Sequence, residues 1–350
     1  MQSLLTSPPR SVCILRLSAI GDVCHALAVV RTLQQAWPAT RFTWVIGKLE
    51  AKLLGHLPDI EFLVYDKAQG LKGVNTLRKQ LHGRQFDVLL HMQLAIRASA
   101  LAAVIPARIK LGFDLPRARE MQWLFTTHRI APAQRQHVLD GFFGFAERLG
   151  VSERALRWDI PLPESAQEYA RKVIPDGDRA LIISPCSSHS LRNWRAEHYA
   201  QVADHAIATY GLRVALCGGR SKLEQETGAR IETHMKERCV NMIGKDTLLE
   251  LLATLQRATL LISPDSGPAH MATCVSTPVI GLYAATNPAR SGPYLSLPLC
   301  VDKYDEAACK FLGKAANEIP WTTKIEKPGV MDLITPEDVI QKLQEFMARK

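Results

Sequence analysis

The first part of the chain alternates short apolar runs with longer segments in which apolar residues recur at helical spacing. The short runs are rich in aliphatic and aromatic residues and predict buried strands at 12–17, 41–46, 62–65 and 86–91. The longer segments predict helices at 23–36, 71–82 and 95–104. Strands that alternate with helices in this way are typical of a parallel, doubly wound α/β sheet.

The same alternation begins again after the proline-rich segment 160–163, a candidate domain boundary. Strands are predicted at 180–183, 213–217, 260–262 and 279–283, and helices at 198–210, 223–236 and 247–256. A last helix is predicted to begin at Thr335, a suitable N-cap that is followed by proline. Ligands of such sheets bind outside the carboxyl ends of the strands, so we expect a site in the cleft between two α/β halves.

One predicted strand end is followed by more potential ligand-binding side chains than the others. The apolar run 258–262 is followed by the segment SPDSGPAH, in which a helix is predicted to open near Pro268. Backbone N–H groups at a helix start have no intrahelical partners, and the helix dipole is positive there, so anions bind readily. The segment indicates a phosphate or nucleotide-sugar pocket at Asp265, Ser266, Gly267 and His270. The alternative is that Asp265 and Ser266 only cap the helix.

Composition indicates a globular protein, since 47% of the 350 residues are hydrophobic. No run approaches the ~20 apolar residues needed to span a bilayer, and the first ten residues lack the apolar core of a signal peptide. We therefore expect a soluble, cytoplasmic protein. The eight cysteines include no C-x-x-C pair, and several lie inside apolar runs. This is typical of reduced core residues, not of disulfides or a zinc site.

The formal net charge of +9 is unevenly distributed along the chain. Residues 1–160 contain 21 Lys and Arg against 12 Asp and Glu, whereas residues 161–350 contain 22 of each. A basic half joined to a neutral half suggests contact with something anionic, such as phospholipid, a phosphorylated acceptor or nucleic acid. The alternative is a charged surface that only keeps the protein soluble.

Asp22 lies in the first predicted strand–loop–helix junction. Neither half has G-x-G-x-x-G, a Walker A loop or a metal-binding helix motif such as H-E-x-x-H, so a dinucleotide bound in the Rossmann manner is disfavoured. On spacing alone Asp22 is most simply the N-cap of the helix from Val23. As a functional group it would be a general base that faces the cleft, where the helix dipole favours negative charge.

Hydroxyl groups follow the first strand of the second half at Ser187 and Ser188, with Arg192 shortly after. A guanidinium beside hydroxyls can hold a pyrophosphate by charge-assisted hydrogen bonds. Glu224, in the helix after Gly218 and Gly219, can accept hydrogen bonds from ribose hydroxyls. The structural alternatives are a polar loop with a solvated arginine, and a glutamate at a helix start.

Basic side chains are crowded between two predicted helices of the first half. Such a cluster suits recognition of carboxylates or phosphates on an acceptor, and a solvated loop is the alternative. The candidates for acceptor binding are Arg97, Arg117, Arg119 and His137, with Arg129 and Arg135 nearby.

These motifs, in their order along most of the chain, resemble the heptosyltransferases, the lipopolysaccharide-core branch of glycosyltransferase family 9. The segment from Leu17 to His25 is similar to the family's first loop, whose aspartate, here Asp22, is taken as the catalytic base. The segments GFD at 112–114, RE at 119–120 and QH at 136–137 resemble its acceptor side. The sequence HMQL at 91–94 departs from the D-x-Q-G that relatives often show after the fourth strand.

In the second half, Asp265-Ser266-Gly267 with His270 matches the family's D-[ST]-G-x-x-H, its most specific motif. Ser187, Ser188 and Arg192 stand where the family binds donor phosphates, with Arg192 in place of the usual lysine. The tail from 312 to 331 resembles most the heptosyltransferase I type, which acts on Kdo-lipid A.

The resemblance implies the GT-B fold, in which two Rossmann-like, doubly wound domains flank a cleft. It implies an acceptor-side domain at 1–160 that carries the catalytic base. It further implies an ADP-sugar donor domain at 161–334 and a C-terminal helix at 335–350 that packs back on the first domain.

The implied reaction is an inverting transfer of L-glycero-D-manno-heptose from ADP-heptose to Kdo of lipid A. Asp22 would remove the proton of the acceptor hydroxyl, while Arg192, the hydroxyls of Ser187 and Ser188, and the helix start after Ser266 would stabilise ADP. No metal and no cofactor are expected, because protein groups meet the phosphate charge. We expect a monomer that lies peripherally on the anionic cytoplasmic face of the inner membrane of a Gram-negative cell.

Three alternative functions fit some of the same residues. A GT-B sugar-nucleotide 2-epimerase would use the same anion loops without a lipid acceptor. A family 9 transferase that acts on a later core heptose would share every motif. A nucleic-acid-binding protein would use the basic half, but the basic residues are not interleaved with aromatic ones and no known binding module is present, so nucleic acid is not an expected partner.

Overall fold

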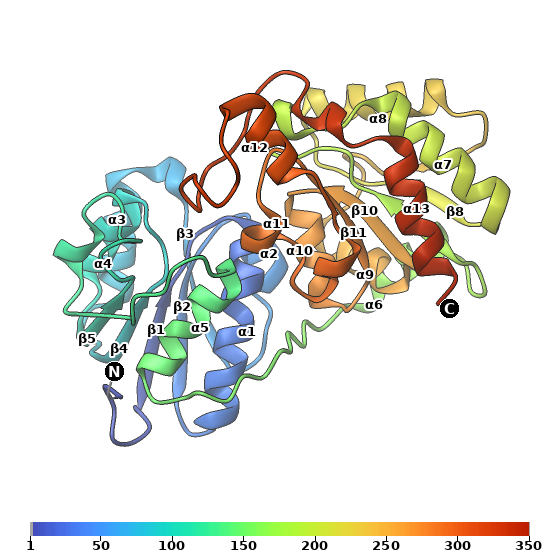
Figure 1. The fold of residues 1–350 in the computed structure, drawn as a ribbon. Helices are drawn as coiled ribbons and strands as arrows, with labels where there is room; N and C mark the ends of the chain where they lie inside the picture. The colour runs from blue at the N-terminus through green and yellow to red at the C-terminus, as the bar shows by residue number, and fades with distance from the viewer. Residues whose placement is uncertain (1–2, 350) are drawn as a thin grey trace. The chain divides into compact units, whose positions relative to one another are not determined.

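The computed structural model describes residues 3–349 and forms two compact units, of which the first ends at Pro161 and the second begins at Leu162 (Figure 1). Each unit contains a six-stranded sheet. All strand pairs in both sheets are parallel, which confirms the doubly wound α/β class. Between residues 3 and 349, no helix has the length and apolar character needed to cross a membrane.

Within residues 3–161, the first unit is built from six strands and five α-helices. The strands are β1 (Ser11–Leu15), β2 (Arg41–Gly47), β3 (Ile60–Tyr65), β4 (Phe86–His91), β5 (Ala107–Gly112) and β6 (His128–Arg129). The helices are α1 (Ile20–Ala36), α2 (Ala51–Leu54), α3 (Leu71–Gln80), α4 (Ile96–Val104) and α5 (Val138–Arg148). Two 3₁₀ turns, η1 (Lys67–Gln69) and η2 (Gln122–Phe125), lie in the loops.

The second unit repeats the alternation and adds helices at its end. Its strands are β7 (Ala180–Ile183), β8 (Arg213–Leu216), β9 (Val240–Asn241), β10 (Leu260–Pro264), β11 (Val279–Tyr283) and β12 (Val301–Asp302). Its α-helices are α6 (Glu164–Val173), α7 (Ala196–Tyr210), α8 (Lys222–His234), α9 (Leu248–Arg257), α10 (Gly267–Cys274), α11 (Pro288–Ser291), α12 (Tyr304–Leu312) and α13 (Pro336–Met347). Its 3₁₀ helices are η3 (Ser190–Arg192), η4 (Tyr294–Leu299) and η5 (Val330–Leu333).

Both sheets have the same strand order relative to their first strand. The first sheet runs β3-β2-β1-β4-β5-β6 and the second runs β12-β11-β10-β7-β8-β9. In each unit the first strand therefore lies beside the fourth, β1 beside β4 and β7 beside β10. The chain leaves these two neighbours in opposite directions, and ligands of doubly wound sheets bind at this switch point, beyond the carboxyl ends of the strands.

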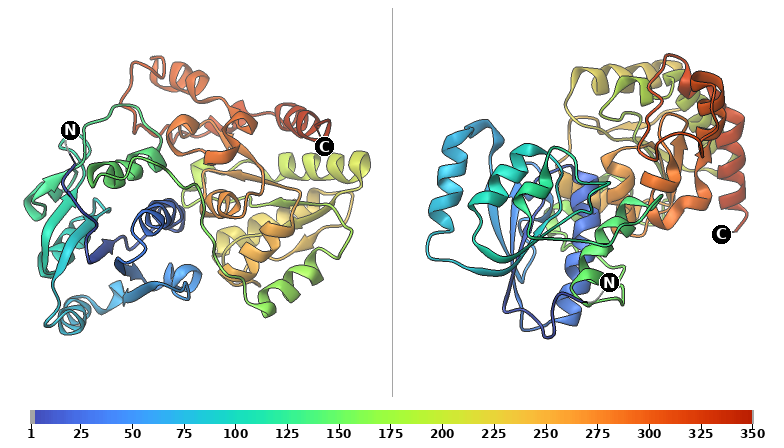
Figure 2. Two further views of the ribbon diagram at one scale, coloured as in Figure 1. Left: turned by 90° about the horizontal axis from the view of Figure 1, so that it is seen from below. Right: turned by 60° about the vertical axis from the view of Figure 1, so that its left-hand side comes forward.

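The helices of the first unit cover both faces of its sheet (Figure 1, Figure 2). Leu77 of α3 and Leu101 of α4 pack in one cluster with Cys13 and Leu15 of β1. Helices α1 and α5 contact each other on the opposite face. Both faces of β1 are thereby buried, as the unbroken apolar run in its sequence predicts.

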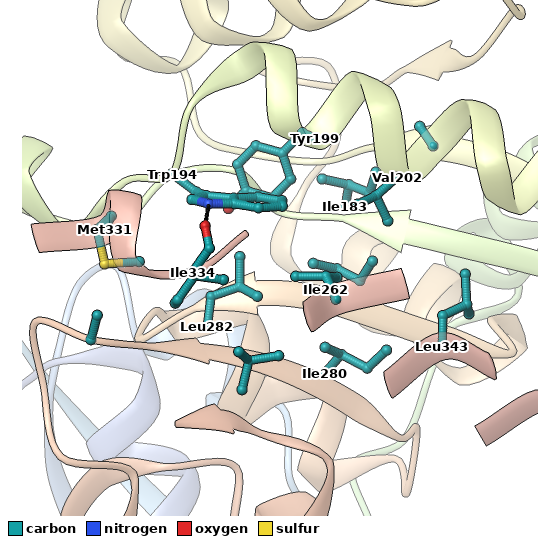
Figure 3. Packing of buried hydrophobic residues seen from close by; sticks show 14 of the residues in the cluster. Ile183, Trp194, Tyr199, Val202, Ile262, Ile280, Leu282, Met331, Ile334 and Leu343 are labelled. Atoms are coloured by element: carbon teal, nitrogen blue, oxygen red, sulfur yellow. Dashed lines mark hydrogen bonds between the residues drawn. The ribbon is translucent and has the colours of Figure 1, made fainter. Parts of the chain in front are cut away.

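Alternate residues of the strands of the second sheet face one continuous core (Figure 3). Ile183, Ile262 and Ile280 come from three neighbouring strands and pack with Tyr199 of α7. Helix α13 adds Leu343 to the same cluster and contacts α7, β11 and β12. The apolar face of this last helix is therefore buried within the second unit.

Candidate active site

Several of the predicted functional residues lie at the switch points of the two sheets. In the first unit, Asp22 follows β1 and Gln93 follows β4. In the second, Ser187 follows β7 and Asp265 follows β10. The chain topology thus gives each unit one pair of loops that carry polar side chains to the position where doubly wound sheets bind ligands.

Asp22 is held at the start of α1 but is not its N-cap. The helix begins at Ile20, three residues earlier than the sequence predicts, so Asp22 occupies the third helical position. Its Oδ2 accepts a hydrogen bond from the backbone N–H of Ala19 at 3.3 Å and pairs with the guanidinium of Arg16. Both contacts use Oδ2, and 34% of the side chain is exposed, so the carboxylate is fixed on one side and reachable on the other.

Arg16 is a buried partner that the sequence shows only as a charge interrupting an apolar stretch. Its Nη1 donates to the carbonyl of Met92 at 2.5 Å, and its guanidinium lies 5.3 Å from the ring centre of Phe142. The arginine therefore links the loop after β1 to the loop after β4. It carries its positive charge to the carboxylate of Asp22.

Gln93 fixes the same loop from the other strand. Its Oε1 accepts the backbone N–H of Leu17 at 2.7 Å, and its Nε2 donates to the hydroxyl of Ser18 at 3.3 Å. Gln122 in turn donates to the carbonyl of Gln93 at 3.0 Å. The glutamine of the unusual HMQL segment is thus a support for the segment that leads to Asp22.

Two further buried polar groups lie near this loop. Burial raises the pKa of Glu50, and the Asp22 carboxylate acts in the same direction, whereas Lys67 and Arg16 oppose it. Burial lowers the pKa of His91 to about 3, so this imidazole is neutral, and its Nε2 lies 3.1 Å from the Ser99 hydroxyl. His91 therefore packs in the core of the unit. The sequence analysis predicted neither the raised pKa of Glu50 nor the core position of His91, because both depend on burial.

Two of the acceptor candidates are engaged in building the first unit. Arg117 pairs with the buried Asp114 and donates to the side chain of Gln136 at 3.0 Å. His137 is the N-cap of α5, where its Nδ1 accepts the backbone N–H of Leu139 at 3.1 Å. Arg117 thereby ties together the loops that follow β5 and β6, and His137 fixes the start of α5.

The other two acceptor candidates are exposed and lie close together. The backbone N–H of Ile96 donates to the carboxylate of Glu120 at 2.5 Å. Arg97 and Arg119 are the immediate neighbours of these two residues in the chain, and both are exposed. The contact therefore brings the chain at Arg97 close to the chain at Arg119 in the first unit.

The loop after β7 contains Ser187, Ser188 and Arg192, the candidates for binding the donor substrate, and is closed by hydrogen bonds within the loop. The backbone N–H of Ser187 donates to Oδ1 of Asn193 at 2.7 Å, and its hydroxyl donates to the carbonyl of His189 at 3.0 Å. Ser188 is exposed at the tip. Arg192 closes the turn, and its guanidinium pairs with Glu326, a residue that the sequence analysis did not single out.

The loop after β10 contains the most specific motif. Ser266 is the N-cap of α10, and its hydroxyl lies 2.7 Å from that of Ser263. Gly267 and Pro268 form the first helical positions. Asp265 accepts a hydrogen bond from the Ser291 hydroxyl at 3.0 Å, and its other oxygen lies 3.8 Å from His270 Nε2. The Asp265 carboxylate therefore lies between Ser291 and His270 and holds this loop, and it does not cap the helix.

Glu224 and Asp246 flank the loop after β8. Glu224 accepts the backbone N–H of Gly219 at 2.6 Å and forms a capping box with Ser221 at the start of α8. These bonds match the structural alternative, a glutamate at a helix start. The sequence analysis did not single out Asp246. Burial raises the pKa of this carboxyl group to about 7, and the charge of Glu250 acts in the same direction.

Two parallel, doubly wound units with polar loops at both switch points define a GT-B glycosyltransferase architecture. The sequence model of the family described as "glycosyltransferase family 9 (heptosyltransferase)" matches residues 74–319 of this chain. The chain is 44% identical over 343 residues to the lipopolysaccharide core heptosyltransferase OpsX of Haemophilus influenzae, covering 98% of this chain and 99% of that protein. It is 25% identical to lipopolysaccharide heptosyltransferase 1 of Escherichia coli K12, covering 81% and 90% of the two chains. The chain belongs to glycosyltransferase family 9 and is a lipopolysaccharide heptosyltransferase.

Solved structures confirm the GT-B fold. A family 9 glycosyltransferase from Veillonella parvula superposes with a TM-score of 0.81 at 23% identity, covering 97% of this chain and 98% of that one. The Escherichia coli heptosyltransferase WaaC, solved with ADP, gives a TM-score of 0.72 at 20% identity, covering 96% and 99%. Family membership confirms that the chain is a glycosyltransferase and decides against the epimerase alternative.

Proposed function

We propose that this enzyme transfers L-glycero-D-manno-heptose from ADP-heptose to Kdo of lipid A with inversion at the anomeric carbon. The observation that carries the proposal is the carboxylate of Asp22, which Arg16 and the Ala19 N–H hold by one oxygen beside a switch point. The donor assignment is supported by the Escherichia coli relative that was solved with ADP.

In this mechanism Asp22 accepts the proton of the acceptor hydroxyl, whose oxygen attacks the anomeric carbon of the heptose. The bond from that carbon to the diphosphate breaks, and the electron pair leaves with ADP. The hydroxyls of Ser187 and Ser188, the guanidinium of Arg192 and the N-terminus of α10 would stabilise the charge on the leaving diphosphate.

The remaining donor candidates would shape the pocket around the nucleotide sugar. Asp265 and His270 order the loop after β10, and Gly267 lets a ligand approach the backbone at the start of α10. Glu224 holds the loop after β8 through Gly219, and we assign the ribose side of the donor to this loop.

The acceptor would meet the exposed guanidinium groups of Arg97 and Arg119. Guanidinium groups bind carboxylates and phosphates by paired hydrogen bonds, and Kdo-lipid A carries both kinds of anion. Arg117 and His137 would act by holding the loops of this region, through Asp114 and the start of α5.

The direct test is the mass of purified Kdo-lipid A after incubation with ADP-heptose and the enzyme. We expect a gain of one heptose residue and release of ADP. Parallel reactions would use Kdo-lipid A phosphorylated on Kdo and an acceptor that already carries a heptose. Transfer only to the heptose-bearing acceptor would still show heptosyltransferase activity, but it would overturn the assignment of Kdo as the acceptor sugar.

We further propose that the protein is cytoplasmic and lies peripherally on the inner membrane through the edge that carries Arg97 and Arg119. Five large apolar side chains are exposed there, all on α4 or on the segment that follows β5. They are Ile96, Leu115, Met121, Trp123 and Leu124, which we call the rim patch. Exposed apolar and aromatic side chains beside arginines are typical of contacts with anionic bilayer surfaces.

Replacing Trp123 and Leu124 together by serine should weaken binding to vesicles that contain anionic lipid by roughly tenfold or more, because each side chain loses its burial in the interface. Flotation or sedimentation of the protein with vesicles measures the effect. The matched control replaces Leu223 and Leu295, two exposed leucines of the second unit, by serine. Equal losses in both double variants would show that the rim patch is not the contact surface.

A further inference from the structure

Arg192 uses two of its nitrogen atoms on a single carboxylate oxygen. Its Nε donates to Oε1 of Glu326 at 2.8 Å, and its Nη2 pairs with the same oxygen. Only 11% of the arginine side chain and 27% of the glutamate side chain are exposed. Two contacts to one oxygen fix the edge of the planar guanidinium and therefore the direction in which its third nitrogen points.

The backbone around Arg192 is fixed independently of this ion pair. Its own N–H donates to the carbonyl of His189 at 2.9 Å, which closes the turn that carries Ser187 and Ser188. Two residues later, the buried indole of Trp194 donates to the carbonyl of Ile334 at 2.9 Å (Figure 3). Arg192 therefore cannot move far without breaking the turn.

The backbone beside Glu326 is also anchored. The N–H of Ile325 donates to the carbonyl of Ala285, just beyond β11, at 2.8 Å, and the Ile325 side chain is buried. Tyr304 donates its hydroxyl to the carbonyl of Thr323 at 2.9 Å. Glu326 is thus carried by a segment that is attached to the carboxyl end of the sheet, which suits a fixed support and not a side chain that an entering ligand displaces.

The surroundings of the pair retain positive charge. Burial lowers the pKa of Lys324, and the cationic Arg192 and Arg290 act in the same direction, whereas Glu326 and Asp265 oppose them. Three cations therefore lie within electrostatic range of two carboxylates. The Glu326 carboxylate leaves an excess of positive charge for an anionic ligand.

We propose that Glu326 is a positioning residue for the donor: it holds Arg192 by Nε and Nη2 and thereby presents Nη1 to the diphosphate. The inference rests on the proposed role of Arg192 in donor binding. Within residues 3–349, no group is hydrogen-bonded to Nη1. An arginine can offer two nitrogen atoms to a carboxylate and its third to a phosphate in one fixed plane, whereas the ammonium of a lysine is a single point charge with no fixed direction.

The first test compares Glu326→Ala with Glu326→Gln. Alanine should raise the donor KM and the Kd of ADP by about tenfold and change kcat little, because the guanidinium loses its fixed direction. Glutamine keeps an oxygen that accepts from Nε, so its values should stay near those of the wild type. Tighter ADP binding by both variants would instead identify Glu326 as a competitor of the phosphates and overturn the proposal, as would wild-type values for alanine.

The second test is a double-mutant cycle that does not depend on the alanine variant. Arg192→Lys should weaken ADP binding measured by calorimetry, and Arg192→Lys combined with Glu326→Gln should recover part of it, since the ammonium is released from the carboxylate. Wild-type affinity in Arg192→Lys, or no recovery in the double variant, would contradict the proposal.

Arg192→Ala separates this inference from the proposed function. If that variant binds ADP and the donor like the wild type, the donor role of Arg192 fails and the positioning role fails with it. If Arg192→Ala weakens binding while Glu326→Ala does not, only the positioning role of Glu326 is wrong.

Discussion

Asp22→Asn should lower kcat by roughly 10²- to 10⁴-fold, the usual contribution of a general base. The amide has nearly the shape of the carboxylate and can still accept the N–H of Ala19, which lies 3.3 Å from Oδ2 in the wild type. It cannot take a proton from the acceptor hydroxyl. The Kd of ADP should stay near the wild-type value, because the donor candidates belong to the second unit.

The measurement is release of ADP in the presence of a saturating acceptor, together with calorimetric binding of ADP to the same preparation. Asp66→Asn is the matched control. Asp66 also follows a strand of the first sheet, accepts a backbone N–H at 3.0 Å and pairs with a lysine at 3.1 Å. It follows β3, an edge strand away from the switch point, so its replacement should leave kcat nearly unchanged. Wild-type turnover in Asp22→Asn would remove Asp22 from the proton transfer.

Most of the strands that the sequence predicts are buried on both faces, and the half-exposed edge strand β3 is the exception. β1, β4, β7 and β10 lie in the interior of their sheets, and each contains an apolar run of three or more residues that is typical of a buried strand. β5 was missed because Arg108 and Lys110 interrupt its apolar residues. β9 and β12 have only two residues each, which is too short for any pattern to show.

The start of α1 differs from the start that N-cap preferences predict. Asp22 is a favoured residue at an N-cap, so the sequence predicts a helix from Val23. In the structure Ala19 occupies the N-cap, a residue type with no capping side chain. Asp22 instead reaches back to the backbone of Ala19 from the third helical position. Tertiary contacts made by Gln93 and Arg16 set the loop, and local preference does not reveal them.

The places of the candidate site residues in the fold could be predicted from the sequence, but their contact partners could not. Asp22, Ser187 and Asp265 follow predicted strands, and the strand-end rule places them at a ligand site. Arg192 and Glu326 are 134 residues apart in the chain, and Leu17 and Gln93 are 76 apart. No spacing rule connects such pairs. They become visible only when the sheet brings the segments together.

Asp265→Ala should have the largest effect on stability among the site residues. Burial alone would raise the pKa of Asp265, but the neighbouring His270 and the hydroxyl groups of Ser291 and Thr286 hold it below its usual range. Its removal leaves a buried imidazole and a buried hydroxyl without this carboxylate. We expect a loss of about 2–4 kcal/mol in the free energy of unfolding of the second unit. The melting temperature should fall by roughly 5–15 °C.

The same variant should also bind ADP more weakly, because the loop that leads to the start of α10 is ordered around Asp265. Asp265→Asn separates the two contributions. Its amide oxygen can accept the Ser291 hydroxyl, which lies 3.0 Å from Oδ2 in the wild type, but it carries no charge toward His270. We therefore expect a loss of stability and affinity between those of the wild type and the alanine variant.

The pH dependence of stability checks the ionic part of this argument. The pKa of Asp265 is lower in the folded protein than the ordinary value of 3.8, so the ionised carboxylate stabilises the fold above that pH. This stabilisation is lost as the pH falls through the folded-state pKa. The difference in melting temperature between wild type and Asp265→Asn should be full at pH 7 and shrink below about pH 4. A difference that is unchanged by pH would mean that packing and the Ser291 hydrogen bond, not the charge, hold the loop after β10.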